Sequence, residues 1–305
     1  MCISSGCNNA GTVRLTAPTG AETNVAGIIG MAQAGTTVEN CRNLEGAVVT
    51  AQGKIASSSL CVGGIAGSTN SGTVKLLHCY NYGTVEQTHT SSAGTLYIGG
   101  IDGYPYVIGL MQYCGNHGPV TAKSATNIYQ GGLGGRPRTG AEATGNVIKD
   151  CYNAYDLTFS GKATTYYAGG LIGHYGKNKE QVPTLENLIN LGNLTFAATG
   201  TLSTTYYGGV MGGTTNGAVN NDYDFTGVNT VNVYSIPTSP LNDYDINKSS
   251  NRYGTPEELG DVKQTLVLMQ DRSFTFVIDR KNQDDTMGVK AAGTALARQI
   301  REQVI

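Results

Sequence analysis

Two short motifs recur along this 305-residue chain at nearly the same interval, and this repetition restricts the possible folds more than any other feature of the sequence. The first motif is a hydrophobic residue followed by small residues and a closing glycine, as in "VGGIAG" and "IGGIDG". Its second small residue is Gly27, Gly64, Gly100, Gly132, Gly170 and Gly209, at intervals of 37, 36, 32, 38 and 39 residues. Such a period is typical of repeat architectures in which each repeat packs against its neighbours.

The second motif, "HCYNYGTV" and its variants, keeps the same interval. Its marker residues are Cys7, Cys41, Cys79, Cys114 and Cys151, followed by Leu188 in the next repeat. Because leucine can replace cysteine only where packing is the requirement, we expect reduced, buried thiols that act as small hydrophobic residues. Stacked thiols about 4.8 Å apart would not match disulfide geometry. Zinc binding would need shorter spacings between the cysteines.

Each repeat contains three strand-length stretches separated by glycine, asparagine or serine, with almost no helical periodicity. Three strands in about 36 residues form one triangular coil. We therefore predict a right-handed parallel β-solenoid, or β-helix, of about six coils over residues 1–215. Equivalent residues of successive coils would stack, with asparagines hydrogen-bonded along the axis and the six marker glycines supplying special corner conformations.

The composition changes near residue 216. Only 14% of all residues are charged, but their frequency more than doubles in residues 216–305. We predict a second, α/β unit there, with a strand in "VNTVNVYSI", a β-hairpin formed by "KQTLVLM" and "SFTFVID", and a C-terminal helix capped by Asp285. The apolar stripe of this helix runs to the last residue without a glycine cap, so we expect the unit to be incomplete.

Both units resemble known families. With "VGGIAG…HCYNYGTV" and "YAGGLIG…INLGNLTF", residues 5–213 resemble the GLUG-motif-type repeats of bacterial surface and adhesin-like proteins. With "RYGTPEELGD" and "QDRSFTFVIDRKNQDDT", residues 220–305 resemble the N-terminal part of the HK97-like major capsid proteins of tailed phages. The first resemblance implies a cell-surface scaffold, and the second implies a virion protein that contacts other capsid subunits. The chain is either a genuine fusion or two unrelated reading frames joined together.

Several function classes are disfavoured by the sequence. A net charge of -2 without a basic stripe gives no reason to expect nucleic-acid readout. No apolar run approaches the roughly 20 residues that would span a membrane, and the chain as given carries no targeting signal. We expect no cofactor, no metal site and no catalytic residue. Asp102 replaces aliphatic or small residues at the equivalent position of other repeats, and we expect it at a corner or edge.

The leading hypothesis is a non-enzymatic structural and adhesive surface scaffold that presents a repetitive face of the solenoid. The alternatives are a virion structural protein, in which the solenoid decorates a capsid fragment, and a polysaccharide-acting β-helix enzyme with two carboxylates roughly 5 to 9 Å apart. A glycan or a host-surface protein is the expected partner, and tyrosines are its candidate contacts unless they merely cover the solenoid edge. These tyrosines are Tyr104, Tyr106, Tyr166, Tyr167, Tyr206 and Tyr207.

Overall fold

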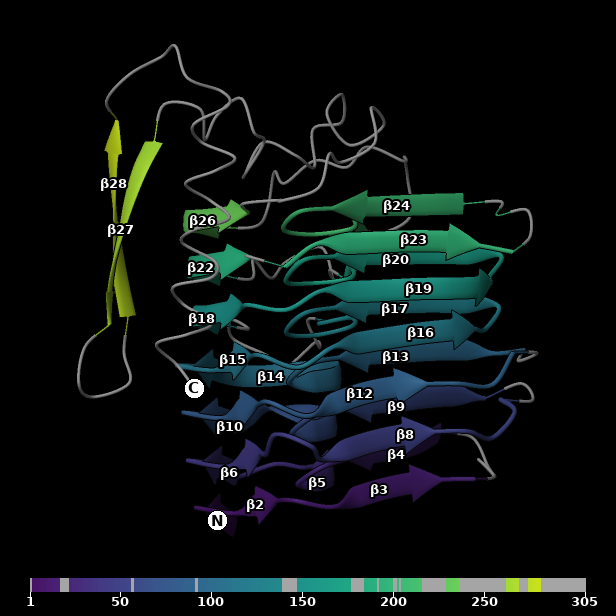
Figure 1. The fold of residues 1–305 in the computed structure, drawn as a ribbon. Coiled ribbons are helices and arrows are strands. Elements are labelled where there is room, and N and C mark those ends of the chain that lie inside the picture. Colours follow the sequence, from purple (N-terminus) through teal and green to yellow (C-terminus); the bar gives the residue numbers. More distant parts are fainter. Residues whose placement is uncertain are drawn as a thin grey trace.

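The chain winds into stacked coils of parallel β-strands, which confirms the predicted β-solenoid (Figure 1). In this computed structural model, the described residues are 2–16, 22–55, 58–90, 93–138, 147–176, 184–190, 192–199, 202, 204–215, 229–235, 262–268 and 274–280. Within them, no helix is long and apolar enough to cross a membrane. Coils rise from the N-terminal end, drawn in purple, to β24 and β26, drawn in green.

Three sheets, A, B and C, form the sides of the solenoid. Sheet B contains β3 (Thr12–Leu15), β8 (Val48–Ala51), β12 (Thr84–Gln87), β16 (Val120–Ser124), β19 (Leu157–Lys162) and β23 (Leu194–Ala198). Sheet C contains β4 (Glu22–Ala26), β9 (Ser59–Gly63), β13 (Thr95–Gly99), β17 (Asn127–Gly131), β20 (Thr165–Gly169) and β24 (Thr204–Gly208). Sheets B and C each have six strands, which correspond to five steps from coil to coil.

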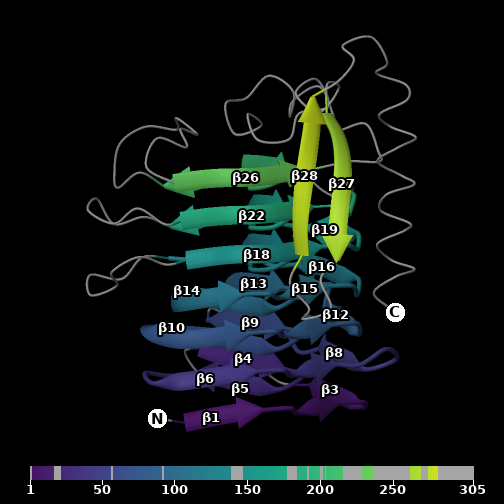
Figure 2. The ribbon, with the colours of Figure 1, turned by 90° about the vertical axis from the view of Figure 1, so that its left-hand side faces the viewer.

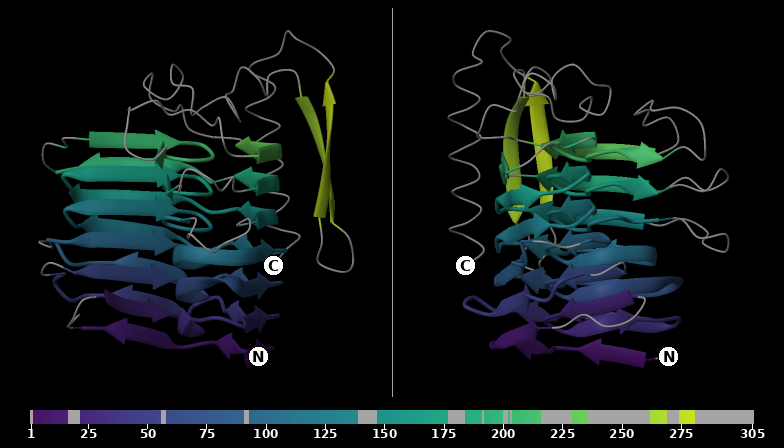
Figure 3. Two further views of the ribbon diagram at one scale, coloured as in Figure 1. Left: turned by 180° about the vertical axis from the view of Figure 1, so that it is seen from behind. Right: turned by 90° about the vertical axis from the view of Figure 1, so that its right-hand side faces the viewer.

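Sheet A has twelve strands because each of seven coils contributes a longer strand, one coil contributes a second, and four coils add a short strand after a corner. The longer strands are β1 (Cys2–Ser5), β5 (Ile29–Ala32), β6 (Thr36–Glu39), β10 (Ala66–Leu77), β14 (Asp102–Gln112), β18 (Val147–Asn153), β22 (Thr184–Asn190) and β26 (Asn229–Ser235). The short strands are β2 (Asn8–Asn9), β7 (Arg42–Asn43), β11 (Tyr80–Asn81) and β15 (Gly115–Asn116). Two further short strands, β21 (Tyr175–Gly176) and β25 (Thr214–Thr215), pair with each other. Figure 2 shows the longer strands of sheet A stacked in sequence order, and Figure 3 shows the same progression from behind.

An asparagine ladder runs along the coil axis, as predicted. Each Nδ2 of one coil donates a hydrogen bond to the Oδ1 of the next. These bonds join Asn9 to Asn43 (2.7 Å), Asn43 to Asn81 (2.7 Å), Asn81 to Asn116 (2.7 Å), Asn116 to Asn153 (2.8 Å) and Asn153 to Asn190 (2.9 Å). The second amide hydrogen of the buried Asn116 is donated to the carbonyl oxygen of Gly118 at 2.9 Å. The amides are therefore satisfied inside the protein, as buried polar groups must be.

The cysteine ladder lies beside the asparagines and packs into the hydrophobic core. Its members Cys41, Cys79, Cys114 and Cys151 are free and fully buried, and so is Leu188. Cys151 pairs in register with Leu188, which confirms that leucine continues the column. Cys7, in the first coil, is exposed. Burial raises the pKa of the Cys114 thiol well above its usual value, so this thiol stays protonated at neutral pH.

The corner before each of these cysteines uses a left-handed backbone conformation. The residues there are Gly6, Asn40, His78, Tyr113 and Asp150, with φ angles of 69°, 55°, 51°, 55° and 52°. Most residues reach this conformation only at a cost of roughly 1–2 kcal/mol. Ring stacking between His78 and Tyr113, with centroids 4.7 Å apart, packs the two bulkiest members of the column against each other.

The six marker glycines lie at equivalent turns, but the predicted reason for them was wrong. None of Gly27, Gly64, Gly100, Gly132, Gly170 and Gly209 is among the residues with positive φ. A Cβ atom at Gly64 would instead collide with the carbonyl oxygen of Gly100 and with the side chain of Asn81. A Cβ at Gly170 would likewise meet the carbonyl of Gly209 and the amide of Asn190. Five of them, Gly27, Gly64, Gly100, Gly132 and Gly170, are needed because the asparagine ladder and the next turn pass too close for any side chain.

The solenoid extends beyond the predicted boundary at residue 215. β26 pairs in parallel with β22, and Val233 takes the register position next to Leu188. The predicted strand in "VNTVNVYSI" therefore exists, but as part of sheet A rather than of a separate unit. Strands β27 (Val262–Leu268) and β28 (Phe274–Arg280) pair antiparallel, which confirms the predicted hairpin. The predicted C-terminal helix and its cap Asp285 lie outside the described residues.

Candidate ligand-binding face

A column of tyrosines runs along sheet C. The strand register aligns Asn24, Cys61, Tyr97, Tyr129, Tyr167 and Tyr206, in that order. In a β-strand, successive side chains alternate between the two faces of the sheet. The neighbours of Tyr97 on β13, Leu96 and Ile98, are fully buried in the core, so the column lies on the outer face. We call Tyr97, Tyr129, Tyr167 and Tyr206 the tyrosine ladder.

The ladder rings stack on one another along the solenoid axis. Ring centroids are 5.2 Å apart between Tyr97 and Tyr129, 5.3 Å between Tyr129 and Tyr167, and 5.1 Å between Tyr167 and Tyr206. The last three tyrosines are half-buried. Burial raises the pKa of Tyr167 to about 12, so its hydroxyl remains a proton donor at neutral pH. Because neighbouring rings cover the ring faces, the ladder can offer a ligand mainly ring edges and hydroxyl groups.

A second column packs against the ladder from the start of the next side of the coil. It contains Tyr104, Arg136 and His174, each directly after the closing glycine of its repeat. Tyr104 stacks on Tyr97 with centroids 4.0 Å apart, and the Arg136 guanidinium lies 4.8 Å from the centroid of Tyr129. We call these three residues the facing column. It is in contact with the ladder along three successive coils.

His174 is buried within this arrangement and is held neutral. Its ring meets Tyr129 and Tyr167 edge-on, with centroids 5.4 and 4.6 Å away. Burial and the nearby Arg136 charge lower its pKa well below the usual value. The neutral ring can therefore accept at Nδ1 the hydrogen bond that Arg136 donates from Nε at 3.3 Å.

The predicted surface tyrosines have different locations. Tyr167 and Tyr206 belong to the ladder, and Tyr106 lies beside Tyr104, with ring centroids 5.2 Å apart. Tyr104 is only 8% exposed, because Tyr97 covers its ring. Tyr207 pairs in register with Ala168.

The prediction for Tyr166 was wrong: this residue is 3% exposed and points into the core. Its ring stacks on Phe159 with centroids 4.5 Å apart, and its hydroxyl donates to Oε1 of the buried Gln130 at 2.9 Å. The "TTYY" sequence thus places one tyrosine on each face of β20. A signal for the ladder was present in the sequence, since Tyr97, Tyr129, Tyr167 and Tyr206 all stand two residues before the first glycine of a "GG" pair.

Asp102 is fully buried, so it does not lie at an exposed edge, but it directly follows the bend at Gly100 and Ile101 and thus stands at a corner, as predicted. It does occupy the predicted equivalent position, because it pairs with Ala66 and Gly134. Its Oδ2 accepts a hydrogen bond from the Thr69 hydroxyl at 2.8 Å, and its Oδ1 accepts one from the backbone N–H of Tyr104 at 3.1 Å. Burial raises its pKa to about 8, despite these two bonds. Asp102 thus anchors the segment that carries Tyr104, the first member of the facing column.

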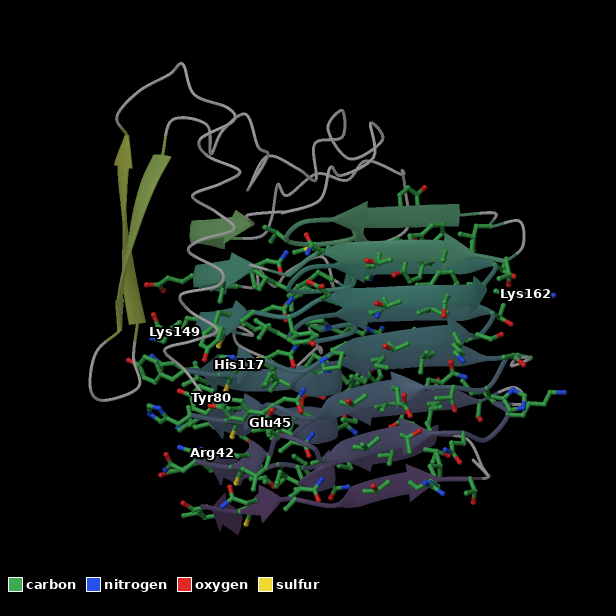
Figure 4. The ribbon with its side chains drawn as sticks, viewed as in Figure 1. Arg42, Glu45, Tyr80, His117, Lys149 and Lys162 are labelled. Atoms are coloured by element: carbon green, nitrogen blue, oxygen red, sulfur yellow. The ribbon has the colours of Figure 1, made fainter. Side chains whose placement is uncertain are left out.

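A smaller aromatic cluster lies over the short strands of sheet A. His117 stacks on Tyr82, with centroids 4.8 Å apart, and its Nε2 is 2.6 Å from the hydroxyl oxygen of Tyr152. Figure 4 shows Tyr80 and His117 one above the other on this side of the stack. This cluster extends over fewer coils than the tyrosine ladder.

The described residues contain no group of three or more His, Cys, Asp or Glu side chains that could hold a metal ion.

Comparisons with known proteins yield one distant structural similarity. No protein-family model and no curated protein matches the chain. A crystal structure from Bacteroides ovatus, described as that of a candidate immunoglobulin A1 protease, superposes with a TM-score of 0.44 and 17% sequence identity. The alignment covers 89% of this chain and 76% of that one.

Proposed function

We propose that this protein is a non-enzymatic binding scaffold and that the tyrosine ladder contacts an extended glycan. The four-ring stack on the outer face of sheet C, in which Tyr97 is buried and Tyr129, Tyr167 and Tyr206 are half-buried, is the observation that carries this proposal. Tyrosine combines an apolar ring with a polar hydroxyl, and such amphipathic groups are enriched at binding surfaces. The ladder repeats this combination at nearly constant spacing, as a polymer of similar units would require. A rigid solenoid holds the row in place without an ordering cost on binding.

The chemistry of the repeated positions supports a scaffold rather than a catalyst. The buried thiols keep their protons, because their pKa values are raised, and a protonated thiol is a poor nucleophile. The amides of the asparagine ladder are used in holding coils together. The buried carboxyl of Asp102 is bonded to Thr69 and to backbone, so it anchors a turn.

The proposal is tested by measuring binding of the whole chain to a panel of immobilised polysaccharides, followed by calorimetry on the best ligand. We expect Tyr167→Ala and Tyr206→Ala each to weaken binding about tenfold or more, since a central contact contributes more than 1 kcal/mol. Tyr155→Ala is the matched control, because Tyr155 is 37% exposed and lies outside the ladder. Equal losses in all three variants, or none, would disprove a role for the ladder.

A surface location and an adhesive role follow as part of this proposal, and a virion protein is the second candidate. The antiparallel β27–β28 hairpin supports the second, because it coincides with the segment that resembles a capsid protein. Long-read sequencing of the source locus discriminates between the two. Capsid sequence that continues beyond residue 305 in single molecules favours the virion protein, and a junction that disappears near residue 216 removes it.

A further inference from the structure

Two arginines place positive charge beside the tyrosine ladder. Arg136 and Arg138 lie on the segment that follows Gly135, and the backbone N–H of Arg138 donates to the carbonyl oxygen of Pro105 at 3.2 Å. Each guanidinium covers a tyrosine ring: Arg136 lies 4.8 Å from the centroid of Tyr129, and Arg138 lies 5.3 Å from that of Tyr106. Cation–π contacts of this kind orient both side chains on the same aromatic surface.

The described contacts of Arg136 are with uncharged groups. Its Nε donates to the neutral His174, and its side chain hydrogen-bonds to the phenol of Tyr97. These groups orient the guanidinium, but they do not neutralise its charge. A partly buried charge is costly without a counter-charge, and the planar guanidinium binds carboxylates and sulfates through two parallel hydrogen bonds. The guanidinium of Arg136 is therefore positioned to bind an anion.

The ladder itself favours the same kind of ligand. Stacking leaves ring edges and hydroxyls as its accessible parts, and the edge of an aromatic ring carries partial positive charge. Ring edges, protonated phenols and the two guanidinium groups all favour electron-rich oxygen atoms. A peptide that adds to a sheet needs a free strand edge. The ladder strands β13, β17 and β20 are paired on both sides, so the face of the sheet must make the contacts.

We propose that the corner formed by the tyrosine ladder, Arg136 and Arg138 binds an acidic glycan. Sugar hydroxyls contact the ladder, and a carboxylate or sulfate group binds the guanidinium of Arg136, with Arg138 adding a second positive charge. This inference rests on the proposed glycan-binding function and specifies the chemical class of the glycan. An acidic polypeptide, which would share only the anionic groups, is the competing ligand in the test.

The test compares a polyuronate with the same polymer after its carboxyl groups have been reduced to alcohols, and a sulfated polysaccharide with its desulfated form. Polyglutamate is the third probe. We expect each acidic polysaccharide to bind the full chain at least about tenfold more tightly than its neutral partner, with affinity falling as salt rises. Arg136→Gln should remove most of this difference. Arg42→Gln is the matched control, because Arg42 (Figure 4) lies on the short strand β7 of sheet A, whereas the ladder lies on sheet C.

The outcomes separate the two proposals. If the neutral and acidic polymers bind equally and Tyr206→Ala weakens both, the glycan-binding function stands and the acidic specificity is refuted. If only polyglutamate binds, or if no polysaccharide binds, both proposals fail. Residual binding of the neutral polymer by Arg136→Gln shows that this variant is folded, so a loss of acidic preference cannot be attributed to unfolding.

Discussion

Asp102 offers a stringent test of the packing at the start of β14. The side chain is fully buried, and burial raises the pKa of its carboxyl from 3.8 to about 8. Between these two pH values the folded protein binds a proton that the unfolded chain has released. Stability from this group is therefore fully present below about pH 4 and is lost as pH rises towards 8.

The magnitude follows from the same shift. Each pKa unit corresponds to about 1.4 kcal/mol, so at pH 7 the buried carboxyl costs about 4 kcal/mol of folding free energy. Asp102→Asn removes the ionisation and keeps the shape of the side chain. The amide oxygen can still accept from the N–H of Tyr104, and the amide nitrogen can donate to the hydroxyl oxygen of Thr69. We therefore expect the variant to be more stable than the wild type, increasingly so as pH rises.

The assay is urea unfolding followed by circular dichroism at several pH values between about 4 and 8. The difference in unfolding free energy between Asp102→Asn and the wild type should be small at about pH 4 and approach about 4 kcal/mol at pH 7. Glu86→Gln is the control, since Glu86 on β12 is another acidic side chain and is partly exposed. A difference that stays constant over this pH range would refute the assignment of a protonated, buried Asp102.

Three further predictions concern the ladders and the facing column. Asn116→Ala should destabilise the fold by about 3 kcal/mol, because it leaves buried hydrogen-bonding groups unpaired in both neighbouring coils. Asn9→Ala, at the exposed end of the ladder, should cost about 1 kcal/mol in the same urea assay. Equal costs would contradict a continuous ladder. Thiol labelling with mass-spectrometric mapping should modify Cys7 in the native protein and Cys114 only after unfolding; native labelling of both would contradict the buried ladder. His174 has a lowered pKa, so stability should fall as pH drops below about 6.5, and His174→Gln should reduce that fall. Melting temperatures measured against pH in the Asp102→Asn background isolate the contribution of His174. An unchanged dependence of melting temperature on pH would refute it.

The repeat period made the coils, the asparagine ladder and the cysteine ladder predictable. The leucine at position 188, which takes the place of a cysteine, is informative because it keeps the period of the repeat while changing the chemistry of the side chain. The hairpin was also predictable, because alternating apolar residues flank a short polar segment. All these features depend on local spacing, which a single sequence shows directly.

Features that depend on contacts between coils were not predictable in the same way. The left-handed corner is occupied by His78 and Tyr113 as well as by Asn40, so residue type alone does not reveal it. The hydrogen bond that Tyr166 donates inside the core goes to Gln130, which belongs to the preceding coil. The pairing of β26 with β22 spans a break in the repeat pattern, where the composition suggests a domain boundary.

The uniform direction of the asparagine ladder has a consequence for how the protein folds during synthesis. In every pair the earlier asparagine donates and the later one accepts, across 34 to 38 residues of sequence. A ribosome adds one such repeat in about 2 to 7 seconds at 5–20 residues per second. The newest finished coil thus presents an amide hydrogen at the position where the asparagine oxygen of the emerging coil accepts it. A strand that docks one residue out of register leaves this donor unpaired, so each coil selects the alignment of its successor before the chain is complete.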